Sequence, residues 1–180
     1  MIDEAHSTGV FGVSGSGLAE ELGVEKKIDI VMGTLSKALG AQGGFVCGSK
    51  KLIEYLVNKS RSFIYSTALS PVTAAAALKA VELIGTEPAR RKKLLENAAS
   101  LRKTFAARGF DISGSESQII PVVMGSVEKT AALSEKLFMA GMLAPAIRPP
   151  TVPEEKCRIR ISLTSEHSLE DINKMAAVIA

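Results

Sequence analysis

Aromatic side chains are scarce in this sequence: tryptophan is absent, and all aromatic residues together make up 4% of the chain. So few rings offer no platform on which the bases of a nucleic acid stack. The formal net charge of +3 at neutral pH is also too small to mark a phosphate-binding surface. We therefore expect no nucleic-acid partner.

Cysteine is nearly absent as well. Cys47 and Cys157 are the two in the chain, and neither has a second cysteine at the spacing of a zinc or redox motif. We expect two reduced thiols, as in a cytoplasmic protein, because disulfides are rare in that compartment. No metal site is expected.

Long apolar runs are also missing. No stretch approaches the roughly 20 apolar residues that span a bilayer, and no charged segment precedes an apolar one at the N-terminus. We expect neither membrane insertion nor export, and a cytoplasmic location. A hydrophobic content of 46% still allows a sizeable core in 180 residues.

What the chain does contain is a lysine in a short polar loop. Residues 28–32 form an apolar run rich in β-branched side chains, which predicts a buried strand, and Gly33 closes it. Lys37 follows in the loop over residues 33–40. Ligands of open α/β sheets bind at the carboxyl ends of strands, so an amine at this place is suited to chemistry.

A second polar pair follows the apolar start of the chain. Asp3 and His6 come three residues apart directly after Ile2, where a strand is expected to end. A carboxylate, an imidazole and an amine at one sheet edge are the groups that hold a pyridine nitrogen, a phenolic oxygen and an aldehyde carbon. Together with Lys37 they predict a pyridoxal phosphate (PLP) site, with Lys37 forming the Schiff base and Asp3 partnering the ring nitrogen.

Two arginines alternate with isoleucines near the C-terminus. Arg158 and Arg160 therefore lie on the same face of a strand expected over residues 158–163. A guanidinium on a rigid strand suits bidentate binding of a carboxylate, so an amino acid is a natural ligand. For Arg158, a surface position at the sheet edge is an equally good interpretation. Arg148 and Thr151 precede the strand in a loop stiffened by prolines.

Four segments of the sequence, taken in order, resemble the α-oxoamine synthases, which are fold-type I PLP enzymes. The resemblance covers nearly the whole chain, and its last two segments are most like the biotin-pathway member of the family. The segments are residues 3–12 (DEAHSTGVFG), 33–40 (GTLSKALG), 63–69 (FIYSTAL), and 146–153 (AIRPPTVP) followed by 158–160 (RIR).

The resemblance implies an α/β fold, namely the C-terminal half of a fold-type I PLP transferase. Residues 1–84 would be the C-terminal part of the large PLP-binding domain with its mainly parallel sheet, and residues 85–180 the small C-terminal α/β domain. Family members are about twice this length and form homodimers. We therefore expect this chain to be a fragment that is inactive alone, or one that works with a complementary N-terminal chain.

The resemblance also assigns roles to single residues. His6 would hydrogen-bond the cofactor's phenolic oxygen and the substrate, and Thr67 would donate to the cofactor phosphate across a dimer interface. The expected catalytic residues are Lys37, His6 and Asp3. The expected cofactor-binding residues are Asp3, His6, Thr34, Ser36, Lys37 and Thr67, and the expected substrate-binding residues are Arg160, which takes the carboxylate, with Arg148 and Thr151. His167 has no assigned role and is expected at the surface.

The implied activity is the PLP-dependent, decarboxylative condensation of an amino acid with an acyl-CoA to an aminoketone. The preferred substrates are L-alanine and pimeloyl-CoA, as in biotin biosynthesis; glycine with acetyl-CoA is the alternative. A non-catalytic relative kept as a scaffold or partner subunit is a further alternative, against which the intact Lys37, Asp3 and His6 argue.

The tetrapeptide Asp-Glu-Ala-His also names a class of RNA helicases. The chain has no phosphate-cradling Gly-x-x-x-x-Gly-Lys-Ser/Thr loop, so the helicase interpretation is not favoured.

Periodicity and capping residues predict the remaining elements. Helices are expected over residues 18–22, 50–58, 71–84, 88–107, 128–140 and from 168 onward. Ser49 and Ser126 are the expected N-caps of the second and fifth of these helices, and Ser168 opens the last one in a capping-box-like start. Strands are expected over 43–48, 119–124 and 143–147, and an extended segment over 63–69. The strand over 43–48 is expected to be buried. The basic run over residues 90–93 is expected to form a solvated helix face.

Overall fold

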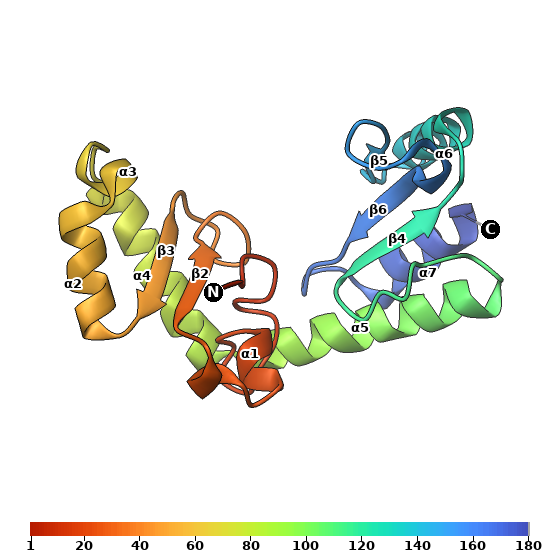
Figure 1. The fold of residues 1–180 in the computed structure, drawn as a ribbon. Coiled ribbons are helices and arrows are strands. Elements are labelled where there is room, and N and C mark those ends of the chain that lie inside the picture. The colour runs from red at the N-terminus through yellow and green to blue at the C-terminus, as the bar shows by residue number, and fades with distance from the viewer. Residues whose placement is uncertain (180) are drawn as a thin grey trace. The chain divides into compact units, whose positions relative to one another are not determined.

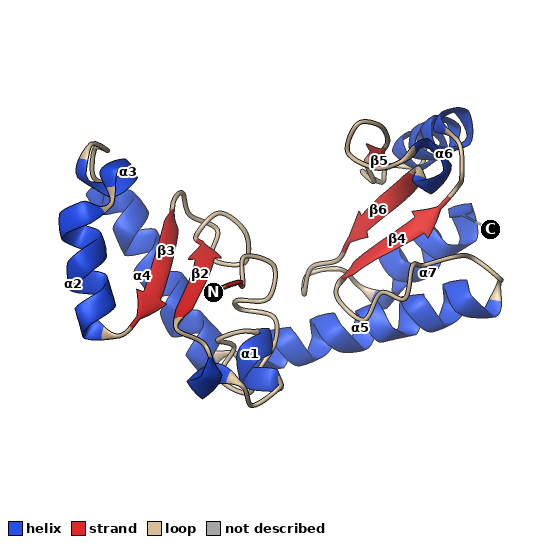
Figure 2. Ribbon diagram, in the orientation of Figure 1, coloured by secondary structure: helices blue, strands red, loops and turns tan. Residues whose placement is uncertain are grey.

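The computed structural model describes residues 1–179, and the chain divides into two compact units with the boundary between Arg91 and Lys92. This boundary lies within helix α5 (Pro88–Ala107), whereas the sequence placed the domain boundary after Ile84. Figure 1 shows the course of the chain, and Figure 2 shows its helices and strands.

The first unit contains a three-stranded sheet in the order β1-β2-β3. Strand β1 (Ile2–Asp3) runs parallel to β2 (Ile30–Thr34), and β3 (Gly44–Gly48) runs antiparallel to β2 (Figure 2). Its helices are α1 (Leu18–Glu21), a 3-10 turn η1 (Glu25–Lys27), α2 (Lys50–Lys59), α3 (Arg61–Ile64) and α4 (Pro71–Thr86).

Strand β2 begins and ends later than predicted. The N–H of Ile28 donates to Glu25 in the preceding turn, so this residue is not available to the sheet. At the other end, Gly33 pairs with Phe45 and Thr34 with Gly44, which extends the strand into the predicted loop. Lys37 therefore follows the strand end by three residues.

Two predictions for the first unit were wrong. Strand β3 is mostly exposed rather than buried, because it is the edge strand of the sheet. The expected extended segment over residues 63–69 begins as a helix, because the carbonyls of Ser60 and Arg61 accept from the N–H groups of Ile64 and Tyr65. The Ser49 cap of α2 and the place of Pro71 in the first turn of α4 were predicted correctly; Ser70, which caps α4, was not predicted.

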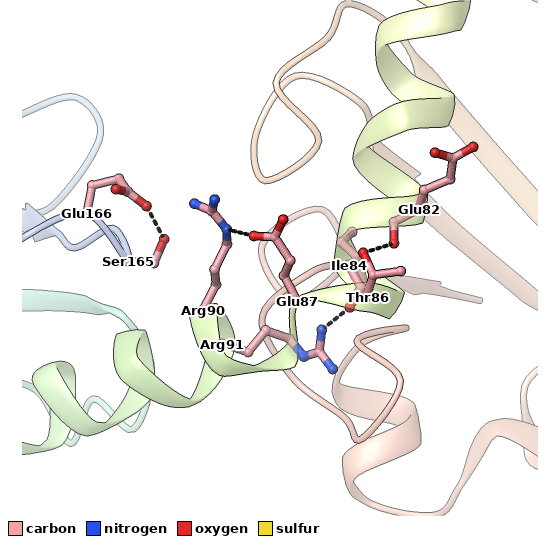
Figure 3. A network of polar contacts seen from close by, with 8 residues as sticks. All are labelled: Glu82, Ile84, Thr86, Glu87, Arg90, Arg91, Ser165 and Glu166. Atoms are coloured by element: carbon pink, nitrogen blue, oxygen red, sulfur yellow. Dashed lines mark hydrogen bonds and ion pairs between the residues drawn. The ribbon is translucent and has the colours of Figure 1, made fainter.

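The basic run at the start of α5 is only partly solvated, contrary to the prediction. Arg91 is buried, and its guanidinium donates to the carbonyl of Ile84 and, at 2.6 Å, to that of Val13. Figure 3 shows the guanidinium directed at Ile84, with Arg90 paired to Glu87 beside it. Arg91 thus ties the end of α4 to the glycine-rich loop of the first unit.

The second unit contains an antiparallel sheet in the order β4-β6-β5. Its strands are β4 (Ile119–Val123), β5 (Ala146–Ile147) and β6 (Arg158–Ser162), and its helices are α6 (Val127–Met139), a 3-10 turn η2 (Glu154–Lys156), α7 (Leu169–Ile179) and most of α5. Strand β5 is shorter than the prediction over residues 143–147, since Pro145 has no N–H to give to a ladder.

The core of the second unit follows the predicted periodicity. Leu101 and Phe105 on α5 are fully buried, as are Ile120 on β4 and Ile159 on β6. The capping box predicted at Ser168 is also present, because the N–H of Asp171 donates to Ser168 and the N–H of Ser168 donates back to the Asp171 carboxylate. These contacts fix β6 and its two arginines on a packed layer.

Candidate active site

Asp3 stands at the end of β1, beside Met32 of the neighbouring strand β2. The N–H of the next residue, Glu4, donates to the Met32 carbonyl at 2.7 Å and carries the pairing one residue further. The Asp3 carboxylate is exposed, and its Oδ1 accepts the N–H of Ala5 at 2.8 Å. The acid is therefore held at the carboxyl end of the parallel strand pair.

Lys37 lies in a closed loop after β2. The N–H of Leu35 donates to the backbone carbonyl of Gly43 at 2.9 Å, and the N–H of Gly40 donates to the backbone carbonyl of Lys37 at 3.0 Å. Leu39 is buried and anchors the loop, whereas the Lys37 side chain is exposed. The backbone is thus fixed while the amine stays accessible.

Two hydroxyls accompany the lysine. The Oγ atoms of Thr34 and Ser36 lie 2.7 Å apart, and Thr34 Oγ1 also donates to the Gly43 carbonyl at 3.1 Å. Ser36 is exposed on the same loop as Lys37. Hydroxyls of this kind can bind a phosphate group when they exchange such internal hydrogen bonds for its oxygens.

The first and second segments of the predicted site meet at a glycine. Gly9, three residues after His6, has a φ of +78°, and a Cβ built on it would lie 2.9 Å from the Cβ of Ala38. Only a residue without a side chain allows this approach. The structure therefore brings the loop after Asp3 and His6 against the loop that carries Lys37.

Glu4 holds the loop between these residues in place, and the sequence analysis missed it. Its carboxylate is buried and accepts the N–H groups of Leu18 at 3.0 Å and Ala19 at 2.8 Å, together with the Ser7 hydroxyl. The only feature of the sequence that could have pointed to this role of Glu4 was its place between Asp3 and His6. A buried carboxylate needs such donors, because leaving it unpaired costs free energy.

The glycine-rich loop over residues 8–17 is held by a second acid. Glu20 accepts the N–H of Ser14 at 2.8 Å and that of Ser16 at 3.1 Å, and it also accepts both serine hydroxyls. These hydrogen bonds, led by the Ser14 N–H, lower the pKa of the Glu20 carboxyl from 4.5 to about 2. The loop is therefore a shaped element rather than a loose connection.

Thr67 lies in the segment between α3 and α4, and its side chain is exposed. Two residues further, Leu69 packs close to Gly43, since a Cβ on that glycine would lie 2.9 Å from Leu69 Cδ1. Gly43 in turn accepts the Thr34 hydroxyl. The Thr67 segment therefore adjoins the lysine loop within the first unit.

The predicted substrate residues lie in the second unit, in two separate cavities. Arg160, Thr151 and Arg158 line a cavity of about 420 Å³, which we call the arginine cavity. Arg148 lines another cavity, with Phe138 and Leu143. The structure thus joins Arg160 with Thr151 and places Arg148 apart from them, although the N–H of Thr151 donates to the Arg148 carbonyl across the Pro149-Pro150 turn.

Three serines that the sequence analysis missed also line the arginine cavity. They alternate along the chain at Ser113, Ser115 and Ser117. Their alternation was no usable signal, because Ser113 has a φ of +51° and lies in a turn rather than in an extended segment. As predicted, Arg160 is exposed on the face of β6 opposite the buried Ile159.

The other singled-out residues have structural surroundings. His167 is half-buried; its Nδ1 accepts the Thr164 N–H, and its carbonyl accepts the Asn97 amide. Cys47 and Cys157 are both free thiols. Within residues 1–179, no group of three or more metal-ligating side chains comes together, and none of the helices is both long and apolar enough to cross a bilayer.

The donor set of the first unit fits PLP. Asp3 supplies a carboxylate of the kind that a pyridinium nitrogen needs, and Lys37 supplies an accessible amine for an aldehyde. Thr34 and Ser36 supply hydroxyls for a phosphate. Acid, amine and hydroxyls are brought to one end of the β1–β2 strand pair.

Comparisons with known proteins show which enzymes this chain is similar to. The chain is 47% identical to 8-amino-7-oxononanoate synthase of Geobacter metallireducens, covering 100% of this chain and 46% of the relative. It is 45% identical to the synthase of Anaeromyxobacter dehalogenans, covering 99% of this chain and 45% of the relative. These names confirm the resemblance to α-oxoamine synthases. The chain spans about half the length of the curated relatives it matches.

Solved structures confirm the predicted fold class. The Sphingomonas wittichii serine palmitoyltransferase has a TM-score of 0.92 at 31% identity, covering 98% of this chain and 45% of that one. A serine palmitoyltransferase of S. paucimobilis with bound PLP gives the same values. The 8-amino-7-oxononanoate synthase of Francisella tularensis has a TM-score of 0.88 at 29% identity, covering 98% and 52%.

A family model provides the broadest match. The model for aminotransferase class I and II matches residues 1–179, which include both units and every residue of the candidate site. The chain therefore belongs to the aminotransferase class I and II family.

Proposed function

We propose that the protein carrying this chain is a PLP-dependent acyltransferase that joins L-alanine to pimeloyl-CoA in biotin biosynthesis. The products are 8-amino-7-oxononanoate, CoA and CO2. The observation that carries the proposal is the contact of Gly9 with Ala38, which sets the loop of Asp3 and His6 against the loop of Lys37. The 47% identity to a protein named as this synthase supports the choice of reaction.

The first unit provides the cofactor site in this proposal. Bound PLP supplies an electron sink beside the substrate Cα. Asp3 holds negative charge at the ring nitrogen, His6 donates to the phenolic oxygen, and the hydroxyls of Thr34 and Ser36 bind the phosphate. Lys37 would hold the aldehyde carbon until the amino group of alanine takes its place there, and the Lys37 amine freed in this way would accept the proton from the alanine Cα as general base.

The second unit provides the substrate site. Arg160 binds the alanine carboxylate, with Thr151 beside it in the arginine cavity and Arg148 in the adjoining loop. A bond forms between the alanine Cα and the thioester carbon, and CoA leaves as its thiol. The carboxylate then leaves as CO2, and its electron pair stays at Cα, where a proton is added.

A homodimer and a cytoplasmic location belong to the same proposal. Large apolar side chains are exposed on the first unit, among them Phe63 on α3 and Val72 and Leu78 on α4. Exposed apolar surface of this kind favours association. In the dimer, Thr67 donates to the cofactor phosphate of the neighbouring subunit; the alternative is a complementary N-terminal chain that covers the same surface.

The direct test is CoA release from pimeloyl-CoA in the presence of PLP and L-alanine. We expect release by a protein of the relatives' full length that carries this sequence, and none by its Lys37→Ala variant. Binding of PLP without turnover of any substrate pair would instead support a non-catalytic relative. Sustained turnover by the 180-residue chain as a monomer would contradict our expectation that this chain is inactive alone.

Glycine with acetyl-CoA, the reaction of 2-amino-3-ketobutyrate CoA ligase, is the second candidate. The similarity to serine palmitoyltransferases favours testing other amino acids as well, since those structures superpose with a TM-score of 0.92. Alanine, glycine and serine should each be combined with acetyl-, pimeloyl- and palmitoyl-CoA. The pair with the highest kcat/KM identifies the reaction.

A further inference from the structure

The arginine cavity contains more positive charge than one substrate carboxylate requires. Arg158 and Arg160 both line it, and within residues 1–179 no acidic side chain lines it or pairs with either arginine. Arg158 Nε donates to the Lys156 carbonyl at 2.9 Å, which fixes one edge of its guanidinium. Arg158 and Arg160 thus bring two cations to a cavity that no described carboxylate lines.

The spacing of the two charges follows from the strand. Arg158 and Arg160 are alternate residues of β6, so they lie on one face about 6.5 to 7 Å apart along the strand. Arg160 pairs in register with Pro121, and Arg158 pairs with Val123 on one side and Ile147 on the other. The two cations therefore stand side by side on a rigid sheet.

Apart from the hydroxyls of Ser113 and Thr151, the rest of the cavity is apolar or already hydrogen-bonded. Ile119, Pro121 and Ile147 supply apolar lining. The hydroxyls of Ser115 and Ser117 both donate to the Ile119 carbonyl, at 2.6 and 3.3 Å, so they do not compete as donors for an anion. The cavity therefore suits a ligand with an aliphatic middle and an anionic group at each of two points.

We propose that Arg158 binds the distal carboxylate of a dicarboxylic acyl chain while Arg160 binds the amino-acid carboxylate. This inference rests on the proposed function, in which the acyl group is pimeloyl and therefore carries a free carboxylate at its far end. The apolar lining accommodates the methylenes between the two ends. Arg158 is then the residue that distinguishes a dicarboxylic acyl group from a fatty acyl group of the same length.

Binding of free acids to the 180-residue chain tests the inference without any catalysis. The probes are pimelate and heptanoate, which have the same carbon chain and differ by one carboxylate. We expect pimelate to bind about ten- to a hundredfold more tightly, as measured by NMR shifts of the β6 amides, because hydrogen bonds to charged groups contribute that much. Equal affinities of the two acids would overturn the inference.

Two variants assign the effect to Arg158. Arg158→Gln should bring the affinity for pimelate down to that for heptanoate. Lys156→Gln removes the same charge from a side chain outside the cavity and should leave the difference intact. Arg158→Lys keeps the charge in case the glutamine variant fails to fold, and it should retain part of the preference for pimelate. A preference unchanged in both Arg158 variants would refute the role of Arg158.

The catalytic assay separates this inference from the proposed function. With the full-length protein, we expect pimeloyl-CoA to exceed heptanoyl-CoA in kcat/KM, and Arg158→Gln to remove most of that ratio. Turnover with an unchanged ratio in the variant would overturn the role of Arg158 and leave the proposed function standing. If pimelate binding depends on Arg158 but no CoA is released, the role of Arg158 stands and the proposed function is overturned.

Discussion

The Glu4 carboxylate accepts the backbone N–H of Ala19 at 2.8 Å, a contact between residues 15 positions apart in the chain. Glu4 directly follows Asp3, so the hydrogen bond connects the proposed partner of the pyridine nitrogen to the start of α1. The same carboxylate binds Ser7, one residue after His6. One buried acid therefore holds the whole turn between the two proposed catalytic side chains.

Replacing this acid should loosen the turn. We expect Glu4→Ala to lower the free energy of unfolding by about 1–3 kcal/mol, because it leaves buried N–H groups without an acceptor. PLP affinity should fall with it, since Asp3 loses its support. Urea unfolding and PLP absorbance titration measure the two effects. Glu21→Ala is the matched control, because Glu21 accepts one exposed N–H, that of Gly12; equal losses in both variants would contradict the role of Glu4.

Reduction with borohydride should attach PLP to Lys37. The exposed amine in a fixed loop after β2 is the reason, and peptide mapping of the reduced protein is the measurement. Lys37→Ala should abolish the attachment. Lys50→Ala should not, because Lys50 is a solvated side chain that pairs at 3.9 Å with Glu54 on the exposed face of α2. Labelling at any lysine other than Lys37 would show that Lys37 is not the residue that binds PLP.

The contact of Gly9 with Ala38 can be tested separately from backbone strain. Gly9→Ala introduces both a strained φ and a clash with the lysine loop, whereas Gly23→Ala at a φ of +64° meets nothing within 4 Å. Both should cost about 1–2 kcal/mol from the left-handed conformation. Only the change at Gly9 should also weaken PLP binding, measured by absorbance. Equal PLP affinity in both variants would show that the contact does not position Lys37.

The sequence predicted well those features that depend on local patterns. Ser49 and Ser126 cap their helices as expected, because an N-cap is decided within four residues. The faces of β6 were also predicted, since alternation along one strand separates Arg160 from Ile159. The family resemblance came from four such local segments.

Features that depend on distant partners were not predictable in this way. The sequence predicts that Arg91 is one of several solvated cations. It is buried instead, because its guanidinium donates to the carbonyls of Val13 and Ile84 in other parts of the first unit. Phe63 is a different case, because its helix is fixed by local backbone bonds that begin at Ser60, and the prediction of an extended segment was simply wrong there. Arg148 and Arg160 lie in separate cavities because of how the turn at Pro149 and Pro150 folds, and the types of these residues alone do not determine that fold.

The stability of the first unit should depend on pH through Glu20. Its pKa in the folded chain is about 2, below the ordinary value of 4.5, because Ser14 and Ser16 donate to the charged carboxylate. A lowered pKa means that Glu20 stabilises the fold above pH 4.5 and that this contribution is lost as the pH falls from 4.5 through 2.

In Glu20→Gln the contribution is absent at every pH. The difference in unfolding midpoint between the parent chain and Glu20→Gln should therefore be largest near neutral pH and shrink toward pH 2. Asp171, whose pKa is lowered by the Ser168 hydroxyl, is present in both proteins and cancels in that difference. A difference that stays constant from pH 6 to pH 2 would show that the serine hydrogen bonds do not favour the charged form of Glu20.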